Sequence, residues 1–407
     1  MARRRVPVRG GVGLSLAGGG PAGAIYEIGA LRAVQEALDG VDLAALPCYV
    51  GVSAGALLAA CLANGMSPEL LVRIIHGDAD DEEPFEPEIF FAPNYREFVR
   101  RGVSLPHFLA RAVWYLTGGR HDRSILASLS HATRALPLGI FDNEPIRRHL
   151  AKVFTHPGRT DDFRELPSRL TVVAADLESG RAIRFGQPEH PHVPISRAVQ
   201  ASTALPGAYP PVTIDGRVCV DGVLLKTLHA SVALEQGVGL LLCVNPIVPV
   251  DTTTGEAHGG PPPGELLRHG LPAVLSQTFR TLVHSRLEVG IASYAERYPD
   301  ADVVLFEPPR DAYEMFFSNL FSLDARREVC ALAYRATRAD LRRRAAALEP
   351  VFARHGLRLR RDVLDDETRE LWPDVPVAGA RERTNAADAS GNGRERPRRR
   401  PKRAVPR

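Results

Sequence analysis

The clearest chemical signal in this chain is a serine held between two glycines. Ser53 lies two positions after Gly51 and two before Gly55, at the end of a short apolar run and ahead of the helix-forming run 56–60. The pattern predicts a strand, a tight turn and a helix, in which a Cβ at either glycine would collide with neighbouring backbone. The hydroxyl would then project from the sheet near the positive end of the helix. We interpret Ser53 as a nucleophile; the alternative is an ordinary strand-to-helix connection.

Three successive glycines form a second group that could take part in chemistry. Gly18, Gly19 and Gly20 lie between an apolar strand predicted at 12–17 and a helix whose apolar residues recur at helical spacing over 24–38. Glycines before a helix leave backbone N–H groups free to point at one spot, as an anion or oxyanion site requires. In a parallel sheet, both turns lie at the C-terminal edge of the strands. If the two strands are neighbours, the glycine amides therefore face the serine.

The same glycines also match a dinucleotide-binding fingerprint. Gly18, Gly20 and Gly23 satisfy Gly-x-Gly-x-x-Gly, which needs an acidic residue after the second strand to bind a ribose. In this chain a serine follows that strand, whereas Asp39 and Asp42 precede it. A dinucleotide-binding protein is therefore the least favoured of the functions considered.

An activated serine needs a base, and two arrangements compete. A Ser-His-acid triad has the order nucleophile, acid, histidine. The histidines that could serve by chain order alone lack a sharp local signature; they are His229, His258, His269 and His284. In a Ser-Asp dyad, a carboxylate takes the serine proton directly. Asp221 is the candidate, at the end of a hairpin predicted over 211–222 and followed by Gly222, although Asp215 shows the same local pattern.

The composition is that of a large globular protein. The chain has 407 residues, of which 44% are hydrophobic, so that one large domain or two can bury a core. Its five cysteines are scattered through apolar runs, which predicts neither a disulfide framework nor a metal site and favours a reducing, cytoplasmic setting. No apolar run reaches 18 residues, so a membrane-spanning helix is not expected.

The net charge of +3 hides a marked asymmetry. Residues 378–407 contain ten Arg and Lys against three Asp and Glu, which leaves residues 1–377 with a net charge of −4. Glycine, proline, asparagine and serine are interleaved with these charges, so we expect a disordered basic tail. The tail is either a solvated segment or one attracted to anionic lipid or nucleic acid. Peripheral contact with a membrane surface is left open, and no specific nucleic-acid partner is predicted.

The remaining pattern supplies the elements that position these residues. Residues 66–140 begin with charged loops and become dense in aromatic residues, which predicts a helical, cap-like insertion that forms its own core or offers an apolar wall to a ligand. Further predicted elements are strands at 170–175, 182–185, 239–244 and 303–306, and helices at 196–202, 265–296 and 324–355.

Four motifs, in order and spacing, resemble the patatin-like phospholipase family. They are the glycines at 18–20 and 23, the serine turn 51–55, the Ala-Ser-Thr-Ala-Leu-Pro loop 201–206, and the Val-Asp-Gly turn 220–222. The resemblance covers residues 11–245. It implies an α/β fold, namely a three-layer sandwich with a central, mostly parallel sheet, and the activity of a lipid acyl hydrolase that requires no metal or cofactor.

The resemblance also implies a role for each motif. Ser53 would be the nucleophile, held in its elbow by the flanking glycines, and Asp221 would be the general base. The amides of the glycines at 18–20 would form the oxyanion hole. Two residues depart from the family pattern, because Ala22 stands where Arg or Lys is common and Val223 where Gly or Ala is common. These departures motivate the alternative of a non-catalytic lipid-binding or membrane-scaffolding protein of the same fold.

The sequence therefore predicts a serine lipid acyl hydrolase of the phospholipase A, lysophospholipase or lipase type. Its substrate would be a lipid or other fatty-acyl ester, and no oligomeric state is predicted. In chain order, we expect a basic segment at 1–10, a catalytic domain at 11–245 that contains the insertion 66–140, a helical C-terminal extension at 246–377 packed on the core, and the basic tail at 378–407.

Overall fold

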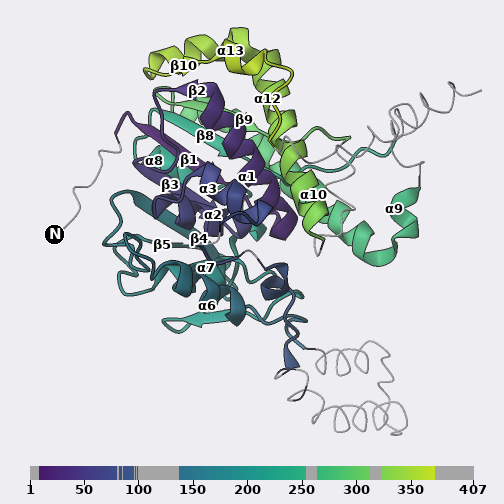
Figure 1. The fold of residues 1–407 in the computed structure, drawn as a ribbon. Helices are drawn as coiled ribbons and strands as arrows, with labels where there is room; N and C mark the ends of the chain where they lie inside the picture. Colours follow the sequence, from purple (N-terminus) through teal and green to yellow (C-terminus); the bar gives the residue numbers. More distant parts are fainter. Residues whose placement is uncertain are drawn as a thin grey trace, which may run out of the picture. The chain divides into compact units, whose positions relative to one another are not determined.

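An eight-stranded sheet forms the centre of the fold (Figure 1). The strands are β1 (Val12–Leu16), β3 (Cys48–Val52), β4 (Arg169–Asp176), β5 (Ala182–Phe185), β6 (Val212–Ile214), β7 (Arg217–Asp221), β8 (Leu240–Val244) and β9 (Asp302–Phe306). Their order is β6-β7-β4-β3-β1-β8-β9, and β5 pairs with β4 off this path. The five strands from β4 to β9 in this order pair in parallel, whereas β5, β6 and β7 pair antiparallel. The predicted α/β class with a mostly parallel sheet is confirmed.

The computed structural model describes residues 9–79, 82–84, 86–95, 97, 99, 137–253, 264–311 and 322–371. The predicted tail 378–407, most of the basic segment 1–10 and residues 100–136 of the predicted insertion lie outside these ranges. The chain divides into a unit Met1–Arg369 and a unit from Glu370 onward, and every described helix and strand belongs to the first unit.

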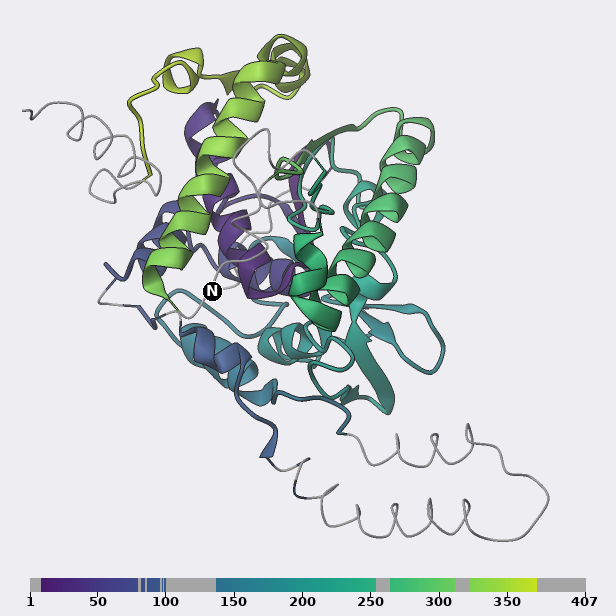
Figure 2. The ribbon, with the colours of Figure 1, turned by 90° about the vertical axis from the view of Figure 1, so that its right-hand side faces the viewer.

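Helices cover both faces of the sheet and make three layers. On one face lie α1 (Gly20–Ala37), α2 (Ala54–Ala63) and α12 (Leu323–Arg354); on the other lie α8 (Ser231–Glu235) and α10 (Gly270–Arg297). Figure 2 shows α12 alongside α1 on one side and α10 on the other. The side chains of β3 alternate accordingly: Val50 and Val52 join the core under α8 and α10, whereas Gly51 faces Ala56 of α2. Burial on both faces explains why β3 is apolar throughout.

The remaining helices and strands are short. They are β2 (Leu38–Asp39), α3 (Pro68–His76), η1 (Pro87–Phe90), α6 (Glu144–Val153), α7 (Ile195–Ser202), η2 (Gly222–Leu224), α9 (Glu265–Arg268), β10 (Arg358–Leu359) and α13 (Arg361–Leu364). The helix predicted at 265–296 is divided into α9 and α10, because Gly270 has a φ of 71° that interrupts the helix. Strand β9 lies beyond residue 245, so the sheet extends past the predicted end of the catalytic domain; the domain boundaries themselves stay predictions.

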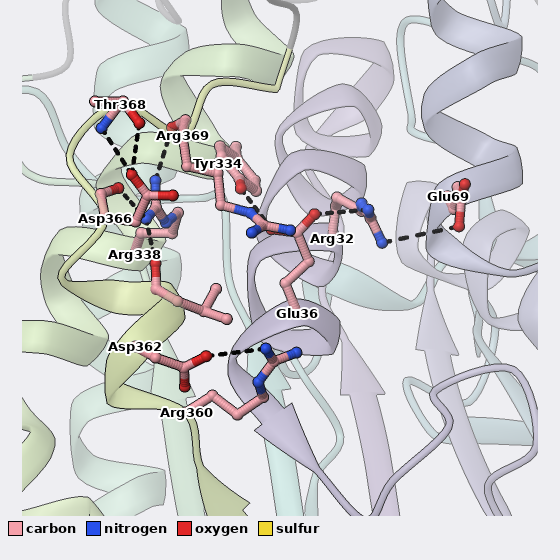
Figure 3. A network of polar contacts seen from close by, with 11 residues as sticks. Arg32, Glu36, Glu69, Tyr334, Arg338, Arg360, Asp362, Asp366, Thr368 and Arg369 are labelled. Carbon is pink, nitrogen blue, oxygen red and sulfur yellow. Dashed lines mark hydrogen bonds and ion pairs between the residues drawn. The ribbon is translucent and has the colours of Figure 1, made fainter.

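A polar network fixes the end of α1 that lies far from its glycine start (Figure 3). Glu36 of α1 accepts hydrogen bonds from the Tyr334 hydroxyl of α12 (2.6 Å) and from Nε of Arg369 (2.9 Å). Arg338 of α12 donates to three backbone carbonyls of the segment 363–369. The helices themselves touch closely, since a Cβ at Gly29 would lie 2.1 Å from the Cys330 carbonyl oxygen. Helix α1, and with it the loop at its start, is therefore firmly placed on the sheet.

Candidate active site

The candidate site lies where two strands meet along one edge of β4. Strand β3 pairs in parallel with β4 up to Val52 opposite Val173, and β7 pairs antiparallel with it so that Asp221 lies opposite Ala174. Strand β5 also pairs with Val173 and Ala174. Because a strand has two edges, β5 must lie along the other edge of β4. Strands β3 and β7 therefore approach each other end to end on one edge, and the register brings Ser53, the residue after Val52, beside Asp221.

The turn that carries Ser53 has the strained geometry expected of a nucleophile elbow. Ser53 has φ 54° and ψ −126°, in the left-handed half of conformational space that residues other than glycine rarely adopt. A Cβ at Gly51 would lie 2.5 Å from the Cα of Ala56, and one at Gly55 would lie 2.3 Å from the Ala17 carbonyl oxygen. Both glycines are thus required by close backbone approach, as the sequence predicted.

A serine to which the sequence analysis gave no role holds this turn. The backbone N–H of Ser53 donates to Oγ of Ser202 (2.8 Å), and that hydroxyl donates in turn to the carbonyl oxygen of Val173 (2.6 Å). All three residues are buried. Ser202 belongs to the loop motif 201–206, so the signal was present in the sequence, but nothing in the motif shows that residue 202 reaches residue 53.

The Asp221 carboxylate is buried, with 1% of the residue exposed, and it lies beside the Ser53 hydroxyl at the same cavity. The backbone N–H of Val223 donates to Oδ1 (2.9 Å), and both this hydrogen bond and the Ser53 hydroxyl lower the pKa of the carboxyl. Burial nevertheless raises the pKa of Asp221 to about 7, because desolvation of the charged form outweighs both effects. A carboxyl with this pKa can exchange a proton with a serine near neutral pH. Gly222 lets the chain turn at this point, since a Cβ would lie 2.4 Å from the Val173 carbonyl oxygen.

The structure separates Asp221 from Asp215, which the local sequence pattern did not. Asp215 lies in the exposed turn between β6 and β7, where its carboxylate contacts Nδ1 of His190 and Nε2 of His192, each at 2.9 Å. Hydrogen bonds from these histidines lower the pKa of Asp215. Of the two aspartates, only Asp221 lies next to Ser53.

The glycine loop lies beside Ser53. Strands β1 and β3 are parallel neighbours, as expected, and the Gly55 N–H donates to the Ala17 carbonyl oxygen (2.9 Å), which ties the loop to the elbow. A Cβ at Gly18 would lie 3.1 Å from the Cβ of Ser53. Gly19 and Gly20 have φ values of 152° and 62°. Within the part of the chain that the structure describes, the amides at 18–20 have no protein acceptor, so they are available to an oxyanion.

The histidines considered for a triad lie elsewhere. Nε2 of His229 donates to the Gly222 carbonyl oxygen (3.2 Å), and burial lowers the pKa of His229 to about 4. His284 of α10 lies between Glu288 and Glu307, at 3.3 and 3.5 Å. His269 follows α9, and His258 lies outside the described residues. Among the described residues that line the cavity at Ser53, none is a histidine.

Ser53 and Asp221 open into a cavity of about 260 Å³. Its wall is mainly apolar and aromatic, with Phe90, Phe91, Phe141, Leu205, Tyr209, Val223, Ile247 and Phe279 among its residues. Phe90 and Phe91 come from the aromatic-rich stretch that the sequence suggested as a wall for a ligand. Phe91 packs edge-on against Phe141, and the Tyr209 hydroxyl donates to the Phe90 carbonyl oxygen (2.6 Å). An apolar wall of this kind suits a fatty-acyl chain.

One cation also faces this cavity. Arg280 of α10 lines it together with Ser276 and Phe279 of the same helix. Its Nη1 donates to the Val248 carbonyl oxygen (3.3 Å), and desolvation lowers the pKa of Arg280, although the guanidinium stays charged. The sequence analysis missed this residue, because it lies on a helix outside every motif. Among the described residues, no three His, Cys, Asp or Glu side chains are grouped closely enough to hold a metal ion.

The chain is similar to known proteins over more than half of its length. The family model for patatin-like phospholipases matches residues 14–234. The chain belongs to this family. An uncharacterised NTE family protein of Mycobacterium tuberculosis is 28% identical over 242 residues, which cover 60% of this chain and 31% of that protein. A second NTE family protein of M. tuberculosis is 38% identical over 81 residues, or 20% of this chain and 21% of the relative. The aligned part of this chain thus spans about a third of the first relative, and less of the second.

Two solved structures of bacterial proteins are also similar. VipD from Legionella pneumophila matches with a TM-score of 0.36 and 16% identity, over 82% of this chain and 66% of that one. The type III effector protein ExoU matches with a TM-score of 0.36 and 14% identity, over 84% and 54%. Likenesses at this level say nothing about the activity of this member of the patatin-like family. Within the described residues, every helix is too short or too polar to cross a membrane.

Proposed function

We propose that this protein is a serine acyl hydrolase that cleaves fatty-acyl esters of lipids through a covalent acyl-enzyme intermediate. Ser53 is the nucleophile, Asp221 the general base, and the amides at 18–20 the oxyanion hole. One observation carries the proposal: the Ser53 hydroxyl lies beside a buried carboxylate whose pKa is raised to about 7, at the wall of an apolar cavity. Membership of the patatin-like phospholipase family supports the same chemistry.

Acylation begins when Oγ of Ser53 attacks the ester carbonyl carbon and its proton passes to the Asp221 carboxylate. The carbonyl oxygen becomes an oxyanion, which the glycine amides stabilise from positions set before the reaction. Collapse of the tetrahedral intermediate breaks the bond to the leaving alcohol, which takes the proton from Asp221. The products of this half-reaction are the free alcohol and an ester between the acyl group and Ser53.

Deacylation repeats these steps with water. A water molecule attacks the acyl-enzyme carbonyl and gives a proton to Asp221, and the second tetrahedral intermediate is held by the same amides. When it collapses, the Ser53 oxygen leaves and recovers the proton, and a fatty acid is released. Asp221 ends each half-reaction as a carboxylate, so the cycle needs only ester and water.

The surroundings of the dyad favour a long acyl chain over a small polar ester. Phenylalanines from η1, from the segment before α6 and from α10 converge on the cavity that holds Ser53. Val223, one of the two departures from the family pattern, packs into the same wall and donates its N–H to Asp221, so it leaves both catalytic atoms in place.

We place the protein in the cytoplasm, in peripheral contact with lipid. Its five cysteines are all free and buried, which suits a reducing compartment.

Labelling with a fluorophosphonate probe tests the proposal directly. Intact-mass analysis should show one adduct, mapped to Ser53, in the parent chain and none in Ser53→Ala. Asp221→Asn keeps the size of the side chain but cannot accept the proton, so its labelling rate should fall by at least about 100-fold. Hydrolysis of a long-chain ester should fall in parallel in both variants.

The matched control is Asp215→Asn, in which an aspartate of the neighbouring turn is changed without contact to Ser53. It should label at the parent rate. A folded parent chain that takes up no probe at Ser53 would reject the hydrolase and favour the non-catalytic lipid-binding alternative. Loss of labelling in Asp215→Asn but not in Asp221→Asn would reject the assignment of the base.

A further inference from the structure

Helix α10 is apolar on two opposite sides. Val283, Leu287 and Tyr294 pack into the core against the sheet. The side turned away from the core carries four leucines that are 58–74% exposed and continue from α9; we call them the outer stripe, and they are Leu267, Leu271, Leu275 and Leu282. At about 100° per residue, the three that belong to α10 lie within about 40° of one another, on the side away from Leu287. A surface helix ordinarily has a polar outer face, so this stripe needs a partner.

The charges around the outer stripe indicate an anionic partner. Two arginines, Arg268 and Arg286, accompany the outer stripe, and residues 266–287 contain no aspartate or glutamate, although Glu265 and Glu288 border this stretch. Arg268 and Arg286 are exposed. Apolar side chains combined with basic residues, and without acidic ones, are the pattern of helices that lie in the headgroup region of a bilayer.

The same helix reaches the cavity that holds Ser53. Ser276, Phe279 and Arg280 line that cavity, one turn from the leucines at 275 and 282. A fatty-acyl ester is held in a bilayer by its own hydrophobicity, so a face that enters the bilayer beside the cavity shortens the path of the acyl chain. This step rests on the function proposed above, whereas the exposure and charge of the helix do not.

We propose that α9 and α10 form a membrane-docking surface, in which the outer stripe inserts into the headgroup boundary of an anionic bilayer and Arg268 and Arg286 bind lipid phosphates. The occupant is therefore a lipid surface rather than a second copy of the chain. Figure 2 shows α10 on the outside of the sheet, on the opposite side from α12. Docked in this way, the protein presents its cavity to the lipid that carries the substrate.

Vesicle sedimentation tests the surface apart from catalysis. The full chain carrying Ser53→Ala, which leaves the lipid intact, is mixed with vesicles of phosphatidylcholine alone or with added phosphatidylglycerol. We expect binding to the phosphatidylglycerol vesicles that weakens with salt. The triple variant Leu271→Gln, Leu275→Gln, Leu282→Gln should bind at least about tenfold more weakly, and loss of each exposed arginine should weaken binding about fivefold. Leu177→Gln, at an exposed leucine outside the stripe, is the matched control and should bind as the parent does.

The basic tail is present in every variant, so it does not account for a difference between them. Equal binding by the parent and the triple variant would overturn the inference. So would a parent chain that does not bind phosphatidylglycerol vesicles. Conversion of a dimer to a monomer by the triple variant, with lipid binding unchanged, would assign the stripe to a subunit contact instead.

A second readout separates this inference from the proposed function. In chains that keep Ser53, the triple variant should react with a small soluble fluorophosphonate at the parent rate, while its hydrolysis of vesicle lipid falls. If the parent fails to label at Ser53 but the vesicle result holds, the proposed function is rejected and the docking surface stands.

Discussion

The rate of acylation at Ser53 should follow the ionisation of Asp221. Burial raises the pKa of this carboxyl to about 7, compared with 3.8 for an ordinary aspartate. With that pKa, about 1% of the molecules carry the carboxylate at pH 5, about 10% at pH 6 and about 90% at pH 8. In the proposed mechanism only the carboxylate accepts the serine proton, so the labelling rate should rise by about 100-fold between pH 5 and pH 8 and then level off.

The measurement is the rate constant for fluorophosphonate labelling between pH 5 and pH 9 at constant ionic strength, followed by intact mass. Circular dichroism at each pH checks that the chain stays folded. A dyad with an ordinary aspartate would give a flat profile over this range. A flat profile, or a midpoint below pH 5, with folded protein would therefore refute the argument that desolvation controls the base.

The raised pKa also makes stability depend on pH. The native state binds the Asp221 proton more tightly than the unfolded state does, so the free energy of unfolding is largest below about pH 4 and falls until about pH 7. The loss is about 1.4 kcal/mol per pH unit, or about 4 kcal/mol in all. Asp221→Asn has no such loss, so its stability relative to the parent should increase by about 4 kcal/mol across this interval. Denaturant unfolding at several pH values measures the increase, and a constant difference would contradict it.

Four further variants test how the site is built. Ser202→Ala leaves the Ser53 N–H and the Val173 carbonyl without their buried partner, so we expect a loss of stability of about 1–3 kcal/mol together with a lower kcat at little changed KM; a lower stability with unchanged kcat would make Ser202 purely structural. Gly55→Ala should cost more than about 3 kcal/mol, whereas Gly20→Ala, with open space around the new Cβ, should cost about 1 kcal/mol, and thermal unfolding compares the two. Arg280→Gln should reduce kcat/KM for esters with an anionic headgroup at least about tenfold more than for neutral esters; equal loss for both classes would reject an electrostatic role for this side chain.

Short-range patterns were enough to predict most of the parallel sheet and the serine turn. The runs at β1, β3, β4 and β8 are continuous and apolar because both faces of these strands are buried, and that pattern is visible without coordinates. The glycines at 51 and 55 are required by contacts with residues close in sequence or on the adjacent strand. Sequence alone was less reliable where one glycine decides a boundary, as at Gly270, which divides a predicted helix into two.

The sequence by itself determined the fold class, the family, the serine on its elbow and the glycine loop, because each depends on a local backbone requirement that only certain residues meet. Tertiary structure decided which acid is the partner of Ser53. Asp215 and Asp221 follow the same turn pattern six residues apart, but only Asp221 lies at the end of β7 that meets the end of β3. The same is true of the pKa of Asp221, of the hydrogen bond from Ser53 to Ser202 and of the apolar cavity. Each depends on residues that are distant in the chain, and a local sequence pattern does not show which of them are buried or close together.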